Sequence, residues 1–208
     1  MVLKREARII GFDDGPFQPH ARGSKVPLVA VVMRGGTYVE AILKSEVTVD
    51  GRDATQTMEA MLTGSNYLDQ IRGILIDGIA FGGFNVVDIF HIARTFELPV
   101  LAVTRDEPDL EAMFRALRTH FEDGEDRVAI IKQGELVKFE YGTTSESSGH
   151  LTTVPTGAHL WGKFAGTDQL GALEILKLTT VRGSLPEPLR LAHLISTALI
   201  RGESKGRA

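Results

Sequence analysis

Acidic residues follow two short apolar runs, where two β-strands are expected to end. Asp13 and Asp14 follow "RIIGF", and Asp77 follows "GILI". Carboxylates brought close together repel one another, and burying them without a partner is costly. A hard divalent cation such as Mg²⁺ removes this penalty because it prefers oxygen ligands. The acids therefore predict a Mg²⁺ or Mn²⁺ site if the two strands are neighbours in one sheet.

A third acid, Asp53, precedes an expected helix and is a candidate to join Asp13 and Asp77 as a metal ligand. Two such ions about 4 Å apart can stabilise the attacking and leaving oxygens in phosphodiester cleavage. Asp14 is expected to point to the other side of the strand and to play a supporting role. Each acid also has a local alternative: Asp53 as a helix cap, and the others as turn residues before glycine.

The elements that must position these acids are read from apolar periodicity. Strands are expected over 7–12, 26–34, 37–47, 73–81 and 98–105, helices over 53–71, 85–96, 108–121, 167–180 and 186–200, and a hairpin over 126–142. Asn85 is expected to cap its helix, and the hairpin to turn at Gln133-Gly134. Antiparallel strands followed by alternating strands and helices predict a mixed α/β sheet with helices on both faces. A ribonuclease H-like sheet has this order, as do several other α/β folds.

Composition narrows the class of protein. The 208 residues suggest one domain over 1–208, and a 43% hydrophobic content argues against disorder. The absence of cysteine excludes disulfides and thiolate metal sites and favours the cytoplasm. We find no signal peptide and no membrane-spanning run. The net charge of -4 predicts that any nucleic-acid contact uses local patches rather than the whole surface.

Several residues outside the acids are candidates for binding phosphate. "FGGFN" leads into an expected helix N-terminus, whose backbone amides can hold an anion, although close backbone packing explains the glycines equally well. Basic residues flank "GSLPEP" and recur in the C-terminal tail, where the alternatives are isolated surface charges and a frayed end. The candidates for substrate binding are Gly82, Gly83, Arg182, Arg190, Lys205 and Arg207.

Four segments resemble an uncharacterised family, domain of unknown function ninety-nine, that is related to endonuclease V. They are "IIGFDDGPF", "VDGRDAT", "GILIDGIAFGGFNVVDI" and "RGSLPEPLRLAH", and the resemblance covers nearly the whole chain. It implies a ribonuclease H-like, endonuclease V-like fold. It also implies Mg²⁺-dependent cleavage of a phosphodiester near deaminated bases in DNA or RNA.

The resemblance also implies roles for single residues. "GFD" and "IDG" match endonuclease V motifs and make Asp13 and Asp77 metal ligands, while Asp53 takes the place of a glutamate ligand. "LPVLAVTR" puts Arg105 where the enzymes have a lysine, and arginine can still hold a phosphate. "PEPLRLAH" matches an endonuclease V segment and makes His193 a candidate acid or base, or a neighbour of the metal.

One segment departs from endonuclease V. "LKSEVTVDGR" lacks the Pro-Tyr-Ile-Pro wedge that separates strands there and exposes the altered base. The chain keeps the acidic residues but lacks the segment that exposes the altered base in endonuclease V. This combination suggests another nucleic-acid substrate or a loss of catalysis. The leading prediction is a metal-dependent phosphodiesterase acting on DNA or RNA, with deaminated or otherwise modified bases as candidate targets. The alternatives are an inactive nucleic-acid-binding protein on the same scaffold and an interaction protein that binds neither metal nor nucleic acid.

Overall fold

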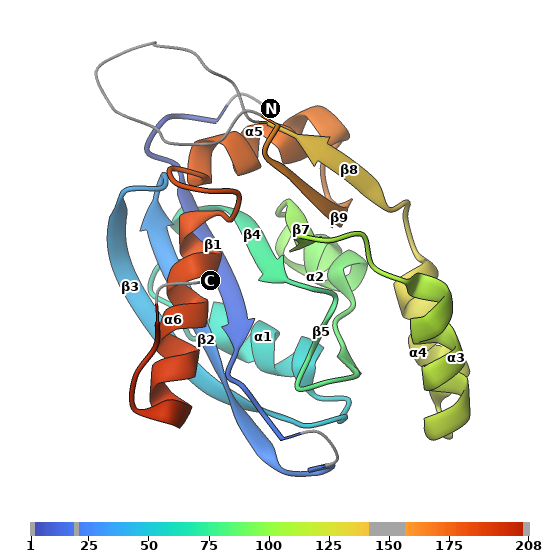
Figure 1. The fold of residues 1–208 in the computed structure, drawn as a ribbon. Coiled ribbons are helices and arrows are strands. Elements are labelled where there is room, and N and C mark those ends of the chain that lie inside the picture. The colour runs from blue at the N-terminus through green and yellow to red at the C-terminus, as the bar shows by residue number, and fades with distance from the viewer. Residues whose placement is uncertain (1–2, 19–20, 142–156, 206–208) are drawn as a thin grey trace.

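A seven-stranded mixed sheet forms the centre of the computed structural model, which describes residues 3–18, 21–141 and 157–205 (Figure 1). Its strands are β1 (Arg8–Asp14), β2 (Lys25–Arg34), β3 (Tyr38–Thr48), β4 (Ile71–Asp77), β7 (Val100–Thr104), β8 (Val137–Glu140) and β9 (His159–Ala165), in the order β3-β2-β1-β4-β7-β9-β8. β1, β4 and β7 run parallel, and the other neighbours pair antiparallel. The predicted mixed sheet is confirmed.

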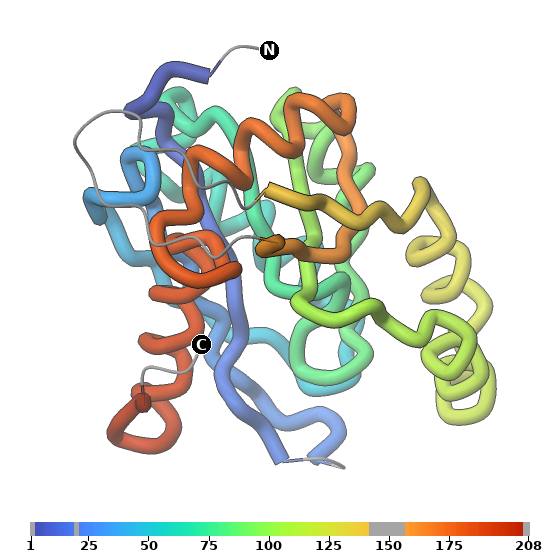
Figure 2. The backbone as a smooth tube through the Cα atoms, turned by 45° about the horizontal axis from the view of Figure 1, so that its top comes forward, coloured from blue at the N-terminus to red at the C-terminus, as the bar shows by residue number. Residues whose placement is uncertain are grey.

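Helices cover both faces of this sheet (Figure 1). The helices are α1 (Ala54–Thr63), α2 (Ile89–Phe96), α3 (Leu110–His120), α4 (Gly124–Lys132), α5 (Gln169–Thr179) and α6 (Glu187–Arg201), with a short 3₁₀ turn at Leu68–Gln70. α1 and α2 lie on one face, α5 and α6 lie on the other, and α3 and α4 pack together beyond the strands (Figures 1 and 2). In the described segments, no helix is both long and apolar enough to cross a bilayer.

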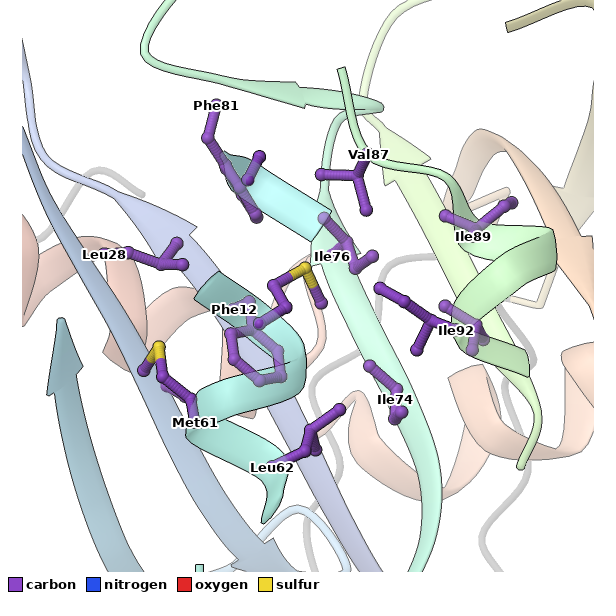
Figure 3. Close-up of a cluster of buried hydrophobic side chains, with 14 of the residues drawn as sticks. Phe12, Leu28, Met61, Leu62, Ile74, Ile76, Phe81, Val87, Ile89 and Ile92 are labelled. Atoms are coloured by element: carbon purple, nitrogen blue, oxygen red, sulfur yellow. The ribbon is translucent and has the colours of Figure 1, made fainter. Parts of the chain in front are cut away.

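The central strands are apolar on both sides because helices cover both faces. Phe12, Ile74 and Ile76 point toward α1 and α2, where they pack in a cluster with Met61, Leu62, Ile89 and Ile92 (Figure 3). The alternate residues Ile9 and Leu75 belong to a second cluster with α5 and the start of α6. Successive side chains of a strand point to opposite faces, so the runs "RIIGF" and "GILI" fill two cores at once.

The C-terminal helix α6 lies directly against β1 (Figures 1 and 2). Gly11 permits this approach, because a Cβ atom there would lie 2.7 Å from the carbonyl carbon of Pro188. A proline in the first turn of α6 is compatible with the helix start, where the first backbone amides have no helical partner. The fold therefore brings the first strand and the last helix of the described chain into contact.

Two expected helices begin or end elsewhere. α2 starts at Ile89 with Asp88 as its cap, whose side chain accepts a hydrogen bond from the backbone of His91, so the prediction that Asn85 caps this helix is wrong. Asn85 instead belongs to β6 (Asn85–Val86), which pairs with β5 (Ala80–Phe81) in a small hairpin. The first helix stops at Thr63, and its C-cap is Gly64, a residue with low helix propensity.

The predicted hairpin over 126–142 is wrong in its first half. Residues Gly124–Lys132 form α4, whose Val128 and Ile131, three positions apart, are buried in a cluster with side chains of α3. A short apolar run does not distinguish a strand from a buried helix turn. Its second half, β8, pairs with β9, a strand that the sequence did not indicate. Lys163 interrupts the apolar pattern of β9, yet it is buried and donates to the backbone oxygens of Gln133 and Gly134.

Candidate metal centre

Two parallel strands carry Asp13 and Asp77 to the same edge of the sheet. β1 and β4 are neighbours with Phe12 opposite Ile76, so the next residue on each strand is an aspartate. β4 ends at Asp77 rather than continuing to 81 as expected, because Gly78 turns the chain with φ +80°. The carboxyl ends of parallel strands are where α/β sheets bind ligands.

Helix α6 adds His193 to the two aspartates. One ligand atom from each of Asp13, Asp77 and His193 lies within 4.8 Å of the others. Within the described segments, no other set of three or more histidines and acids meets this condition. Nδ1 of His193 lies 2.9 Å from Oδ2 of Asp13, and Oδ1 of Asp13 accepts a hydrogen bond from the backbone N–H of Asp14 at 2.9 Å.

The surroundings of this cluster favour protonated carboxyl groups as long as no cation is bound. Burial raises the pKa of Asp13 to about 7, the hydrogen bond with His193 opposes this rise, and the charge of Asp77 adds to it. Burial also raises the pKa of Asp77, while His193 and Arg105 lower it. The hydrogen bond with Asp13 raises the pKa of His193. A divalent cation would stabilise the ionised carboxylates, and Asp13 and Asp77 supply the oxygen ligands that a hard ion such as Mg²⁺ prefers, with His193 beside them.

Asp14 points away from the cluster formed by Asp13 and Asp77 and binds the small hairpin. Its Oδ2 accepts a hydrogen bond from the backbone N–H of Gly82 at 2.8 Å. Burial raises the pKa of Asp14 to about 6, although this backbone hydrogen bond lowers it. Asp14 therefore links the end of β1 to the turn between β5 and β6.

The expected anion site at "FGGFN" rests on a helix N-terminus that is not there. α2 begins at Ile89, several residues later, and the amide of Gly82 is already bound by Asp14. Gly83 lies against Asp50, where a Cβ atom would be 2.5 Å from the Asp50 Oδ1 atom. Close backbone packing, the alternative explanation for these glycines, agrees better with the structure than an anion site does.

Asp53 does not join the cluster of Asp13 and Asp77. Its carboxylate accepts hydrogen bonds from the backbone and side chain of Thr48 at 3.0 and 2.7 Å, from Lys25 Nζ at 3.0 Å and from Asn85 Nδ2 at 2.6 Å. Burial alone would raise the pKa of Asp53, but the bonds from Thr48, Lys25 and Asn85 outweigh it and hold the pKa well below its usual range. The structure therefore groups Asp13 and Asp77 with His193 rather than with Asp53, and which of these residues bind a metal remains a prediction.

A cavity of about 630 Å³ opens at the cluster. Besides the cluster, its wall includes Phe17, Thr197, Arg201 and Lys205. His193, Thr197 and Arg201 are spaced four residues apart on α6, so they lie along one face of the helix. Sequence reasoning missed Phe17 and Thr197, and this helical spacing was the available signal for Thr197.

The remaining candidates lie in different surroundings. Arg105 is exposed, follows β7 directly, and its charge lowers the pKa of Asp77, so it lies near the cluster. Arg190 forms an ion pair with Glu187 at 2.7 Å. Arg182 is exposed in the segment between α5 and α6, and Lys205 lines the cavity. Arg207 lies outside the described residues.

Comparison with known proteins decides the family. A sequence profile described as Endonuclease dU matches residues 5–200. The chain belongs to the endonuclease dU family. It is 42% identical over 207 residues to a UPF0215 protein of Methanosarcina mazei, covering 99% of this chain and 97% of the relative. A UPF0215 protein of Pyrococcus furiosus is 39% identical over 202 residues, covering 97% of this chain and 96% of the relative.

Solved structures share the fold of this endonuclease dU family member. A protein of unknown function from Archaeoglobus fulgidus is 33% identical with a TM-score of 0.77, covering 94% of this chain and 99% of that one. Human endonuclease V is 14% identical with a TM-score of 0.57, covering 94% and 85%. Endonuclease V of Ciona intestinalis, in complex with a DNA containing inosine, is 13% identical with a TM-score of 0.54, covering 89% and 82%. The expected likeness to endonuclease V is confirmed at the level of the fold.

Proposed function

We propose that this protein is a divalent-metal-dependent endonuclease that cleaves phosphodiester bonds in DNA or RNA. The observation that carries the proposal is that Asp13, Asp77 and His193 each offer a ligand atom within 4.8 Å of the others. The two aspartates lie at the carboxyl ends of adjacent parallel strands, and His193 comes from α6. Membership of the endonuclease dU family and the fold shared with endonuclease V support it. Mg²⁺ or Mn²⁺ is the proposed ion, because both accept carboxylate oxygens.

Asp13 and Asp77 would hold the ion, which when bound supplies charge to polarise the phosphodiester and to acidify a water molecule. His193 keeps the Asp13 carboxylate oriented through the contact at Nδ1. The His193 side chain is 39% exposed, so its ring can exchange a proton with a molecule in the cavity. Arg105 lies at the same sheet edge and would contact a phosphate of the substrate.

The substrate is proposed from the cavity and from the relatives. Arg201 and Lys205 in the cavity wall carry the charge that attracts a nucleic-acid backbone, although Glu203 of the same wall lies 3.7 Å from Lys205 Nζ. The family description points to deoxyuridine as the first base to test, and the inosine-containing complex of endonuclease V makes inosine the second. Both nucleosides carry deaminated bases, uracil and hypoxanthine, as the sequence resemblance implied.

A cleavage assay tests this proposal. Labelled single- and double-stranded DNA and RNA, with and without deoxyuridine or inosine, are incubated with Mg²⁺, Mn²⁺ or EDTA. We expect metal-dependent cuts that disappear in Asp77→Asn and persist in Asp69→Asn, an exposed acid just before the opposite end of β4. Circular dichroism checks that both variants fold. Full activity in Asp77→Asn would refute the site, and EDTA-insensitive binding without cleavage would favour the inactive binding protein.

A further inference from the structure

We propose that Phe17 is a stacking surface that receives one nucleobase of the strand whose phosphodiester lies at Asp13 and Asp77. The inference rests on the proposed function for the position of that phosphodiester. It assigns the neighbouring part of the cavity to an unpaired base of a nucleic-acid strand.

The first observation is the exposure of Phe17 inside a charged cavity. Phe17 is 39% exposed, and it lines the same cavity as Asp13, Asp77 and His193. Stacking a flat apolar ring on a water-exposed aromatic face is favourable, because it removes apolar surface of both rings from water. Nucleobases stack on such faces in single-strand-binding proteins, and they do so with little dependence on sequence.

The second observation is that contacts with neighbouring elements support the segment that carries Phe17. The backbone N–H of Gly15 donates to the carbonyl oxygen of Pro27 at 2.8 Å, and Pro16 restricts the backbone just before Phe17. Gly83 lies beside the ring, since a Cβ atom there would be 3.6 Å from Cε2 of Phe17. Asp14 holds the same hairpin through Gly82. A preorganised ring loses little conformational freedom when a base stacks on it.

The third observation is that the cavity that Phe17 lines also carries charged side chains of both signs. The carboxylates of Asp13 and Asp77 would hold a cation for one phosphate. Elsewhere the wall includes Arg201 and Lys205 together with two further acids, Asp14 and Glu203, the second of which lies 3.7 Å from Lys205 Nζ. In a nucleic-acid strand, each base branches from a sugar that carries a phosphate on either side, so a bound phosphate always has a base close by. The volume of about 630 Å³ falls within the range of pockets that enclose such small organic groups. Phe17 therefore offers a way to hold an exposed base in a chain that lacks the Pro-Tyr-Ile-Pro wedge.

The test compares strands with and without bases. The affinities of Phe17→Ala, Phe17→Leu and Phe17→Trp are measured by fluorescence anisotropy on a single strand of deoxyuridine and on an abasic strand of equal length, with Ca²⁺ as the ion. We expect Phe17→Ala to weaken binding of the deoxyuridine strand about tenfold and binding of the abasic strand less than about twofold. Phe17→Trp should retain affinity, and Phe17→Leu should lose most of the effect because it keeps apolar area but no aromatic face.

The matched control is Tyr38→Ala. Tyr38 is 61% exposed and lies at the start of β3, paired with Arg34 at the end of the sheet away from Asp13. The Tyr38→Ala variant should bind both strands with the affinity of the unchanged protein. Equal loss on both strands in Phe17→Ala or Phe17→Leu, or no loss on either, would overturn the stacking role. If the Phe17 variants show base stacking but no substrate is cleaved, the proposed function is refuted and the proposed base site remains.

Discussion

Nδ1 of His193 lies 2.9 Å from Oδ2 of Asp13, although 180 positions separate the two residues in the chain. The aspartate comes from the first strand and the histidine from the last helix, so their contact depends on how closely α6 approaches β1. Gly11 sets that approach, two residues before Asp13. The geometry of the candidate metal centre is therefore coupled to the packing of one helix on one strand.

Gly11→Ala should weaken both the fold and the metal site. The new methyl group would lie 2.7 Å from the backbone of Pro188 and would force α6 away from β1. Overpacking of this kind lowers the free energy of unfolding by about 1–3 kcal/mol. Displacing α6 should also move His193 and reduce Mn²⁺ affinity, measured by titration calorimetry below the melting temperature.

Gly73→Ala is the matched control for this change. A Cβ atom at Gly73 would meet only the side-chain ends of Ile175 and Ile9, both at 3.1 Å, and these can shift. It should lower stability modestly and leave Mn²⁺ affinity unchanged. Unchanged metal affinity in a folded Gly11→Ala protein would show that the site does not depend on this packing.

Metal affinity should increase with pH. Burial raises the pKa of Asp13 to about 7, so at about pH 6 the ion must displace a proton shared by Asp13 and His193. Release of at least one proton predicts a gain in Mn²⁺ affinity of about tenfold or more per pH unit while Asp13, Asp77 and His193 still carry protons, and a plateau once these groups are deprotonated. Calorimetry in buffers of different ionisation enthalpy counts the protons. A pH-independent affinity without proton release would contradict the expected protonation.

Asp53→Asn should affect stability more than cleavage. Hydrogen bonds hold the pKa of Asp53 below its unfolded value of about 3.9, so the charged group stabilises the fold above that pH. We expect the variant to lose about 1 kcal/mol of unfolding free energy near neutral pH. The difference from the unchanged protein should shrink as the pH falls below about 4, because the Asp53 carboxylate of the unfolded chain becomes protonated there, whereas the folded protein takes up this proton only at a lower pH.

Urea denaturation at several pH values measures the stability of Asp53→Asn, and the nuclease assay measures its activity. Retention of most of the cleavage activity would agree with the position of Asp53 outside the cluster. Complete loss of cleavage in a well-folded variant would instead restore Asp53 to the set of metal ligands.

Arg127→Met should destabilise the contact between α4 and the small hairpin. The Arg127 side chain is 7% exposed and donates to the carbonyl oxygens of Asp50 and Phe84 at 3.1 and 2.7 Å. It also pairs with Asp123 at 2.9 Å. Removing it leaves three buried or half-buried acceptors without this partner, and we expect a loss of about 3 kcal/mol in urea denaturation.

Arg118→Met serves as the control on the neighbouring helix. Arg118 pairs with Glu125 at 2.7 Å, but the two side chains are 41% and 73% exposed. Exposed ion pairs contribute little to stability because water and salt screen them, so we expect Arg118→Met to destabilise the protein much less than Arg127→Met does. Equal effects of Arg127→Met and Arg118→Met would mean that burial does not strengthen the Arg127 contacts.

The sequence was most informative where a single local pattern determined the structure. The apolar runs before Asp13 and Asp77 predicted two buried strands, and parallel strands bring their ends to one edge of the sheet. The positions of these two aspartates followed from that rule. Their role as metal ligands, and that of His193, remains a prediction that the cleavage and titration experiments address.

Sequence reasoning failed where tertiary contacts decide the outcome. Nothing in the residues next to Asp53 reveals that Asn85 and Lys25, distant in the chain, bind its carboxylate. The charged Lys163 is one reason why the sequence does not indicate β9 as a buried strand. Its side chain can be buried only because it donates to carbonyl oxygens at the end of a helix that is distant in the chain. Such contacts are properties of the folded chain rather than of a local pattern.

The separation between Asp13 and His193 has a consequence during protein synthesis. β1 and β4 leave the ribosome long before α6, so the growing chain carries both aspartates without the imidazole. During that time it lies beside messenger and ribosomal RNA. Under the proposed function, the nascent protein lacks a complete cleavage centre until its last helix has been translated and has docked on the first strand.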